Sequence, residues 1–457
     1  MITKDSILNL FPSFVRKHAD QIRNSPTGLR LARGTSWSLA GAILSRSLAL
    51  LSSIMLARFL GKEGFGELGI LQSTIGSLGV LAGFGLGITA TKHVAEFKSK
   101  DPSKAGRIMA LSSLTAMISG GFISLILLIL APWLATTALA AEQLSGVLQI
   151  AAGLVFLNAL NGSQTGALSG LEAFKAIAIL NAMAGIYGFL FIVTGAYLRG
   201  LHGAVLGMLI TIALSLILNH IALQRTASKH DMPLTYAGCG KEWKVLGTFS
   251  LPSMLSSLVV SPANWACAAL LVNQANGYAE MGIFNAANQW HMAILFFPSI
   301  VSSTALPIMA SYQAENQQFP YVKTLKWSLF ANLAAALVLA IPVILLSPFI
   351  MASYGETFRS GWDTLALLVF STVIVSSLGA IGQAITAIGK MWWAFALNVF
   401  WAVALLSSFW LLRQHGAFGL ATANLISYGL HFVSVSIFAL CVFSPSARGL
   451  LHRRSTK

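Results

Sequence analysis

The chain has 457 residues, of which 56% are hydrophobic and 9% are charged, and its formal net charge is +15. A soluble domain carries about 25% charged residues, so this composition excludes a soluble protein and indicates a multi-pass α-helical membrane protein. The three cysteines lie far apart and match no disulfide or zinc spacing.

The chain begins with a basic segment, 1–33, whose apolar residues at helical spacing predict an amphipathic helix on the membrane surface, with a disordered tail as the alternative. A bilayer core takes about 20 apolar residues per helix. The sequence predicts twelve such spans, at 34–58, 65–91, 107–130, 143–169, 176–198, 203–223, 246–272, 279–307, 325–347, 362–388, 391–412 and 417–443. A linker over 224–245 separates an N-terminal six-helix bundle, 34–223, from a C-terminal one, 246–443, and a basic tail follows at 444–457.

A short motif occurs twice. Gly64–Ile70 reads GFGELGI, and Gly277–Ile283 reads GYAEMGI. Each copy lies between two apolar runs, so we expect its glycine and aromatic residue to form the turn. Glu67 and Glu280 would then fall in the first turn of the next helix, where a carboxylate complements the helix dipole. The repeat predicts two pseudo-symmetric halves in one orientation, because each half has an even number of spans.

Lysine and arginine are unevenly distributed over the predicted loops. If the N-terminus is cytoplasmic, 23 of the 29 basic residues face the cytoplasm. The remaining six are Arg46, inside a span, and the outer-loop residues Arg58, Lys62, Arg199, Arg359 and Arg413. This asymmetry predicts that both termini are cytoplasmic. Attraction to anionic membrane lipid explains the net charge without a nucleic-acid partner.

Arg46 is a cation near the middle of the first span, and no acidic residue is clearly at that depth. An ionisable residue there costs several kcal/mol unless it faces a cavity or a partner. Arginine can hold phosphate bidentately; the alternative is hydrogen bonding to the backbone of a neighbouring helix. Lys92 ends the second span near the cytoplasmic mouth. The first span also has a small, polar side, as a cavity-lining helix would have: Ser38, Ala42, Ser45, Ala49, Ser52 and Ser53.

A polar patch occupies the eighth span. Asn285, Asn288 and Gln289 share one helix face by their spacing, and His291 lies beside them. Asn264 lies at similar depth in the seventh span. Amides close to tryptophan suit sugar hydroxyls and sugar rings; the alternative is hydrogen bonding between helices.

Nothing in the sequence predicts catalysis. No glycine-rich phosphate loop, no cluster with metal-ligand spacing and no large outer loop is present. We therefore expect a transporter without catalytic residues, metal or cofactor. Gly79, Gly83 and Gly87 form a ridge of small residues in the second span, which predicts close helix packing.

The stretch Ala57–Gly66 (ARFLGKEGFG), with Gly83–Gly87 (GFGLG) running into Lys92, resembles the polysaccharide transporter family, the Wzx-type oligosaccharide flippases. This family belongs to the multidrug/oligosaccharidyl-lipid/polysaccharide exporter superfamily. The resemblance implies a MATE-like fold of two six-helix bundles around a central cavity, with alternating access. It implies a bacterial inner membrane and an undecaprenyl diphosphate-linked oligosaccharide as substrate.

On that resemblance, Arg46 and Lys92 would hold the diphosphate. The sugar would contact Asn264, Asn285, Asn288, Gln289 and His291. The glycan would be a repeat unit of O-antigen, capsule or exopolysaccharide, and membrane lipids, a polysaccharide polymerase and chain-length proteins are expected partners of a monomeric chain. An ion-gradient-coupled multidrug exporter of the same superfamily is the alternative; such exporters typically use intramembrane carboxylates, and this chain departs from that pattern.

Overall fold

A computed structural model describes residues 26–229, 232, 235–251, 254, 258–314, 317–388 and 391–443. Within these residues every regular element is a helix, which confirms the predicted all-α class. The predicted surface helix falls mostly in residues 1–25, and the basic tail is residues 444–457, so both predictions lie outside the described residues.

The first half of the chain contains five long or medium helices. They are α3 (Pro26–Gly83), α4 (Leu86–Phe97), α5 (Pro102–Trp133), α6 (Ser145–Gly170) and α7 (Phe174–Ser228). The second half contains α9 (Val260–Val272), α10 (Gly277–Ala314), α11 (Gln318–Leu345), α12 (Ser347–Tyr354), α13 (Trp362–Ala387), α14 (Met391–Leu412) and α15 (Gly416–Phe443). Short helical turns connect them: η1 (Leu134–Ala138), η2 (Glu142–Leu144), η3 (Cys239–Glu242), η4 (Leu246–Ser250), η5 (Glu356–Gly361) and η6 (Arg413–His415).

Two of these helices each hold two predicted spans. The backbone of α3 breaks at Gly61, with φ of 70°, and that of α7 breaks at Arg199 and Gly200, where Gly200 has φ of 57°. Positive φ costs glycine little, which is why the chain can reverse there. With these breaks, ten of the predicted spans match one helical segment each, whereas 65–91 is divided between α3 and α4 and 246–272 includes η4 and α9. The first turn was predicted wrongly, since it lies at Gly61 and the Gly64–Ile70 motif is already helical.

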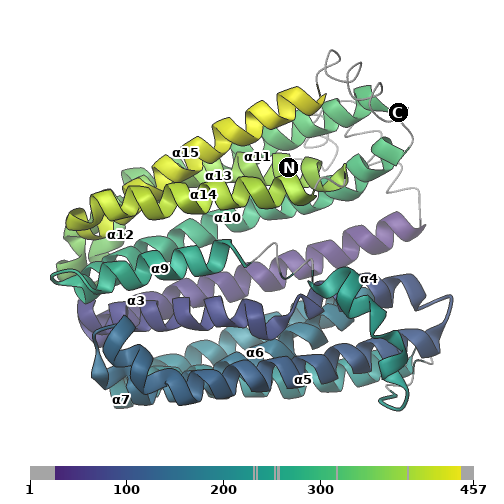
Figure 1. Cartoon of the computed structure of the whole chain (residues 1–457), viewed down its shortest axis with the longest axis horizontal. Helices are drawn as coiled ribbons and strands as arrows, with labels where there is room; N and C mark the ends of the chain where they lie inside the picture. The colour runs from purple at the N-terminus through teal and green to yellow at the C-terminus, as the bar shows by residue number, and fades with distance from the viewer. Residues whose placement is uncertain are drawn as a thin grey trace, which may run out of the picture.

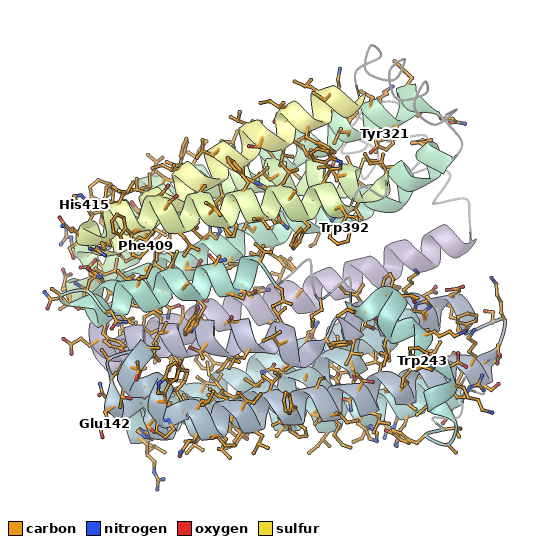
Figure 2. All side chains as sticks on the ribbon, in the orientation of Figure 1. Glu142, Trp243, Tyr321, Trp392, Phe409 and His415 are labelled. Atoms are coloured by element: carbon orange, nitrogen blue, oxygen red, sulfur yellow. The ribbon has the colours of Figure 1, made fainter. Side chains whose placement is uncertain are left out.

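The described residues include seven helical stretches long and apolar enough to cross a membrane. Their outer faces carry apolar side chains, as α5 shows with Ile118, Phe122 and Ile129, each more than 60% exposed. A stripe of this kind is unfavourable in water and favourable in lipid. The chain is therefore a multi-pass membrane protein. Figure 2 shows side chains that project from the outer surfaces of both bundles.

The helices form two bundles (Figure 1). The first contains α3 to α7, the second contains α9 to α15, and α3 packs against α9 and α10 to join them. The bundles lie close together near α12, and we call this the joined end. They diverge towards the opposite end, where α3 begins at Pro26 and α15 ends at Phe443. In Figure 2, Glu142 and His415 lie at the joined end, and Trp243 and Tyr321 lie towards the diverging end.

Hydrogen bonds across the joined end hold the two bundles together. The Asn273 amide donates to the Ala138 carbonyl at 2.7 Å, and the Tyr278 hydroxyl donates to the Leu139 carbonyl at 2.7 Å. A third bond runs from Arg58 Nε to the Ser353 carbonyl at 2.7 Å, and the Ser53 and Tyr354 hydroxyls lie 3.1 Å apart. Bonds of this kind between membrane helices contribute about 1 kcal/mol each, so the set favours a closed joined end.

The two copies of the repeated motif meet at this end. A side chain on Gly66 would collide with the Tyr278 carbonyl, and one on Gly282 would collide with the Lys62 carbonyl. Glycine therefore lets α3 and α10 approach backbone to backbone. The predicted glycine ridge of the second span is partly wrong: Gly87 packs against Gly162 of α6, but a methyl group on Gly79 or Gly83 would meet no neighbouring helix within 4 Å.

The prediction that each acidic residue of the motif lies in the first turn of its helix is confirmed for Glu280 and wrong for Glu67. Glu280 accepts a hydrogen bond from the Ala417 backbone at 2.8 Å, so it caps α15 as well as lying in the first turn of its own helix. Glu67 lies beyond the first turn and accepts from the Gln143 amide at 3.1 Å, near the start of α6. Both carboxylates still lie near helix N-termini, where negative charge is favourable.

The segment that connects the two bundles contains η3 and η4, and it packs against the first bundle. Arg107 on α5 forms an ion pair with Glu242 of η3, at 2.9 Å. In η4, the Ser250 hydroxyl lies 2.8 Å from that of Thr89 on α4. Within its described residues, the predicted span at 246–272 contains η4, which packs against the first bundle, and α9, which belongs to the second. The predicted domain boundaries remain a prediction.

Candidate functional site

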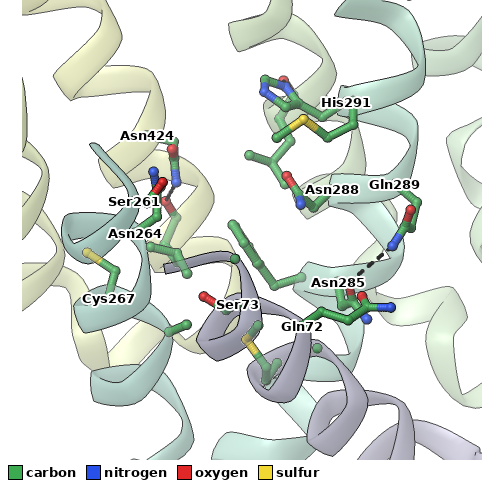
Figure 3. A pocket seen from close by; sticks show the side chains of 18 of the residues that line it. Gln72, Ser73, Ser261, Asn264, Cys267, Asn285, Asn288, Gln289, His291 and Asn424 are labelled. Carbon is green, nitrogen blue, oxygen red and sulfur yellow. Dashed lines mark hydrogen bonds between the residues drawn. The ribbon is translucent and has the colours of Figure 1, made fainter. Parts of the chain in front are cut away.

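A cavity of about 300 Å³ lies where the bundles face each other, between α3 on one side and α9, α10, α13 and α15 on the other (Figure 3). Its polar lining comes from Gln72, Ser73, Ser77, Ser261, Asn264, Asn285, Asn288, Gln289, His291, Asn424 and Tyr428. None of the described lining residues carries a formal charge at pH 7 when His291 is neutral. The cavity can therefore offer many neutral hydrogen-bond donors and acceptors.

Five of the residues predicted from the sequence line this cavity. The helical spacing places Asn285, Asn288 and Gln289 on the face of α10 that looks towards α3 and α9 (Figure 3). Asn264 approaches from α9 on the opposite wall, and His291 lies one turn further along α10. The structure thus brings the two predicted polar groups together, while their contact with a sugar remains a prediction.

The amides on α10 differ in their partners. Asn285 is buried, and its amide donates to the Phe65 carbonyl on α3 at 3.3 Å. Gln289 lies 3.5 Å from the Asn285 oxygen, at the limit of a hydrogen bond. Asn288 is half-buried, and among the described residues it has no protein partner. Asn285 therefore joins the helices, as the alternative interpretation expected, and Asn288 is available to a ligand.

The other two predicted residues have structural partners of their own. His291 is buried, and its Nδ1 lies 2.8 Å from the Thr372 hydroxyl and 3.2 Å from the Leu368 carbonyl. These contacts tie α10 to α13. Asn264 is exposed at the cavity wall and donates to the Val260 carbonyl of its own helix at 2.9 Å. His291 thus fixes the wall, and Asn264 lies at the surface of the cavity.

A second cavity of about 230 Å³ adjoins the first. It lies between α7 and the arm of α3 that precedes Gly61, and Gln72 and Gln289 line both cavities. The predicted polar side of the first span faces it through Ser45, Ala49, Ser52 and Ser53. The expectation of a cavity-lining first helix is confirmed for these four residues.

The two predicted cations lie outside both cavities. Arg46 is exposed, and its guanidinium lies 5.8 Å from the centre of the Phe296 ring on α10, so it reaches from one bundle to the other. Lys92 is exposed on α4, with its ammonium 4.1 Å from the Phe249 ring of η4. Neither forms an ion pair with a described carboxylate, and Arg46 has no hydrogen bond to a described backbone carbonyl. Cation–π contact attracts each charge without neutralising it.

Several lining residues were not predicted. Gln72 precedes Asn285 by the same interval that separates the two motif copies, so the repeat could have identified it. Asn424 and Tyr428 line the cavity from α15, within a long apolar run. Their polarity is visible in the sequence, but nothing there places α15 beside α9. Within the described residues, no three His, Cys, Asp or Glu side chains gather as a metal site would require.

Comparisons with known proteins agree with this arrangement. The EPS I polysaccharide export inner membrane protein EpsE of Ralstonia solanacearum is 23% identical over 409 residues, covering 88% of this chain and 91% of the relative. The lipid III flippase of Escherichia coli (strain K12) is 26% identical over 415 residues, covering 88% and 97%. Both relatives are transport proteins by name, and they match nearly the whole chain.

Two solved structures share the fold at 15% sequence identity. A multidrug resistance MATE family transporter in an inward-facing conformation has a TM-score of 0.75 and covers 89% of this chain and 98% of its own. The lipid II flippase MurJ in an inward closed conformation has a TM-score of 0.68 and covers 89% and 87%. These likenesses confirm the predicted all-α, MATE-like fold, and the twelve predicted spans are compatible with it.

The family model described as polysaccharide biosynthesis protein matches residues 31–313, which is more than half of the chain. The matched region includes the motif that carries the resemblance, the repeated motif on α10 and most of the cavity lining. The chain therefore belongs to the polysaccharide biosynthesis protein family, which confirms its resemblance to the Wzx-type polysaccharide flippases.

Proposed function

We propose that the chain is a flippase that moves an undecaprenyl diphosphate-linked oligosaccharide across the bacterial inner membrane. The glycan would be a repeat unit of O-antigen, capsule or exopolysaccharide. The observation that carries the proposal is an amide-lined, uncharged cavity between two bundles, with an exposed arginine just beyond it. The names of the relatives support it, since one is a polysaccharide export protein and another a lipid III flippase.

The geometry suggests how the substrate would be divided. On α10, Asn285, Gln289 and Met292 line the cavity, and Phe296 follows at the next helical position on that side. Arg46 lies over Phe296, about one helical turn of 5.4 Å beyond the cavity. We propose that Arg46, with Lys92 nearer the mouth, holds the diphosphate and the amide cavity holds the adjoining sugar. The polyprenyl chain would extend into lipid between the diverging bundles.

The joined end provides the element that must move. A substrate that crosses between the bundles must pass the contact of α3 with α10 and the hydrogen bonds around it. We propose alternating access, in which these contacts form in the state described here and break in the opposite state. On the topology proposed from Lys and Arg, the joined end is periplasmic and both termini are cytoplasmic. We further propose that the flippase is a monomer acting beside a polysaccharide polymerase and chain-length proteins.

The cavity does not favour multidrug export, the alternative function. A carboxylate at membrane depth would compensate the charge of an organic cation. The described lining of both cavities contains none. The amide-rich lining instead favours ligands that both donate and accept hydrogen bonds.

Reconstitution tests the proposed function directly. The full-length protein would be placed in liposomes with an undecaprenyl diphosphate-linked oligosaccharide, and exposure of the glycan on the opposite leaflet would be measured over time. We expect protein-dependent transfer, and restored surface polysaccharide when the gene is returned to a deletion strain. A protein that is correctly inserted but moves no lipid-linked glycan in either assay would contradict the proposal.

Reporter fusions test the proposed orientation. A cytoplasmic reporter attached after residue 457, or inserted within 224–245, should be active at both positions, because 23 basic residues are predicted on that side. A periplasmic reporter at the same positions should be inactive. Activity of the periplasmic reporter at either position would overturn the map.

A further inference from the structure

We propose that the two adjoining cavities select a neutral glycan, one that carries no carboxylate, phosphate or other ionised group on the sugars nearest the lipid. This inference rests on the proposed flippase function and specifies the substrate class of the same site. The first evidence is the absence of charge on the described walls of the two cavities. Among the described residues that line the two cavities, none is Asp, Glu, Lys or Arg.

The walls are rich in groups that suit neutral sugars. Six carboxamides line the first cavity, at Gln72, Asn264, Asn285, Asn288, Gln289 and Asn424. A carboxamide both donates and accepts, as a sugar hydroxyl or N-acetyl group does, so the two can satisfy each other. A carboxylate only accepts, and its charge needs a cation or water as well. In a partly dry cavity an uncompensated charge is far more costly than a neutral polar group.

The cations of the protein cannot readily supply that compensation. Arg46 lies beyond the cavity over Phe296, where the proposed function assigns it to the diphosphate. Lys92 lies against Phe249 of η4 and lines neither cavity. From residue 245 through residue 314 the sequence contains a single charged residue, Glu280. Its carboxylate caps α15 at the joined end and would repel an acidic sugar.

The second cavity is also lined by neutral residues, so the same requirement applies to a second sugar. Gln72 and Gln289 line both cavities, so a glycan that passes these two amides meets hydroxyl groups of Ser45, Ser52 and Thr211 together with apolar surface. Serine and threonine hydroxyls are also neutral donors and acceptors. The requirement for an uncharged group therefore applies to the first sugar and to the sugar that follows it.

A matched pair of substrates tests the inference. Two lipid-linked oligosaccharides would be prepared that differ only at C6 of the sugar nearest the lipid, where one has an alcohol and the other a carboxylate. Initial transfer rates would be measured with the full-length protein in liposomes. We expect the neutral substrate to move about tenfold faster, the usual effect of one poorly satisfied charged group.

Variants assign that selectivity to the cavity. Asn288→Arg places a cation on the wall at an amide without a protein partner, so we expect it to raise the rate of the acidic substrate and reduce the ratio to below about threefold. Gln317→Arg adds the same charge at an exposed position between α10 and α11, outside both cavities, and should leave the ratio unchanged.

The outcomes separate the two proposals. Equal rates for the two substrates, or a faster acidic one, with the wild-type protein would overturn the neutral-glycan inference and leave the flippase function standing. Transfer of neither substrate would overturn the flippase function itself. If Asn288→Arg fails to fold, the wild-type comparison still decides, because it needs no variant.

Discussion

Arg46 is a cation at membrane depth, where insertion costs about 2.5–3.5 kcal/mol on translocon scales. Among the described residues, its guanidinium makes one electrostatic contact, a cation–π contact with the Phe296 ring. If it binds the diphosphate, Arg46→Lys keeps the charge but loses the bidentate geometry, and Arg46→Ala loses both. We expect transport to fall from wild type to Lys to Ala, with the alanine variant about tenfold to a hundredfold slower. Surface polysaccharide in a complemented deletion strain measures this order.

A matched control uses the same type of contact elsewhere. Arg413 lies 5.0 Å from the centre of the Trp410 ring, in η6 at the joined end, and lines neither of the two cavities described above. Arg413→Ala should therefore keep transport near wild type at equal protein levels. Full polysaccharide display by Arg46→Ala would show that Arg46 is a packing residue.

Asn285 and Asn288 allow binding to be separated from packing. Asn285 is buried and bonded to the Phe65 carbonyl, so Asn285→Ala should lower stability by about 1 kcal/mol. Asn288 faces the cavity without a described protein partner, so Asn288→Ala should leave stability unchanged and slow transport by about tenfold. Thermal unfolding in detergent and liposome transfer rates measure the two effects. A destabilised Asn288→Ala with normal transport would contradict this assignment.

At the scale of single residues, the sequence predicted part of the candidate site. Helical spacing identified the α10 face, because side chains three and four apart share one side of a helix. The hydrogen bond of His291 to Thr372 could not be predicted, because it depends on α13 packing against α10. For the same reason, the bond of Asn285 to a backbone carbonyl was one of two open alternatives until the structure placed α3 beside it.

At the scale of elements, apolar run length predicted the twelve spans but not how they end. The reversal at Gly61 was misplaced by a few residues, because a positive φ leaves no hydropathy signal and several glycines follow. The span at 246–272 was predicted as one helix because its composition is uniform. Its two described elements contact different bundles, which depends on tertiary packing.

Alanine substitutions at two glycines of α3 should have different effects, because the two glycines face different surroundings. A methyl group on Gly66 would meet the Tyr278 carbonyl, whereas one on Gly79 would meet open space. Gly66→Ala should therefore force α3 away from α10, loosen the joined end and reduce transport by at least about tenfold. Gly79→Ala should be tolerated.

Thiol labelling from the face that we propose to be periplasmic would report the change at the joined end. We expect a cysteine at Ala138 to react faster in the Gly66→Ala background than in the Gly79→Ala background. Equal reactivity together with equal transport would show that the glycine contact is not part of the closed state.

At the scale of the whole molecule, the motif repeat predicted two related halves, which stays a prediction, and the fold comparisons confirm the MATE-like architecture. Which end the halves would share was not predictable. The joined end is held by side chains that donate to backbone carbonyls, as Asn273 and Tyr278 do, and every residue has such a carbonyl. The sequence therefore shows the donors but not their partners.

If transport requires the joined end to open, a covalent link across it should stop transport. Ala138 and Asn273 lie on different bundles and are connected by a 2.7 Å hydrogen bond from the Asn273 amide. Cysteines at both positions, with Cys239, Cys267 and Cys441 replaced by serine, should react with a short bifunctional thiol reagent. We expect the linked protein to lose transfer in liposomes almost completely, because alternating access needs these bundles to separate.

The single-cysteine variants, treated with the same reagent, provide the control, since each carries the chemical modification without the link. A reagent that reducing agents cleave adds a second control, because transport should return when the link is broken. Mass spectrometry of the digested protein gives the linked fraction. If fully linked protein still moves the substrate at the wild-type rate, the substrate does not pass between Ala138 and Asn273. The closed contact of α3 with α10 would then be a permanent joint between the bundles, and the path would have to run along another face.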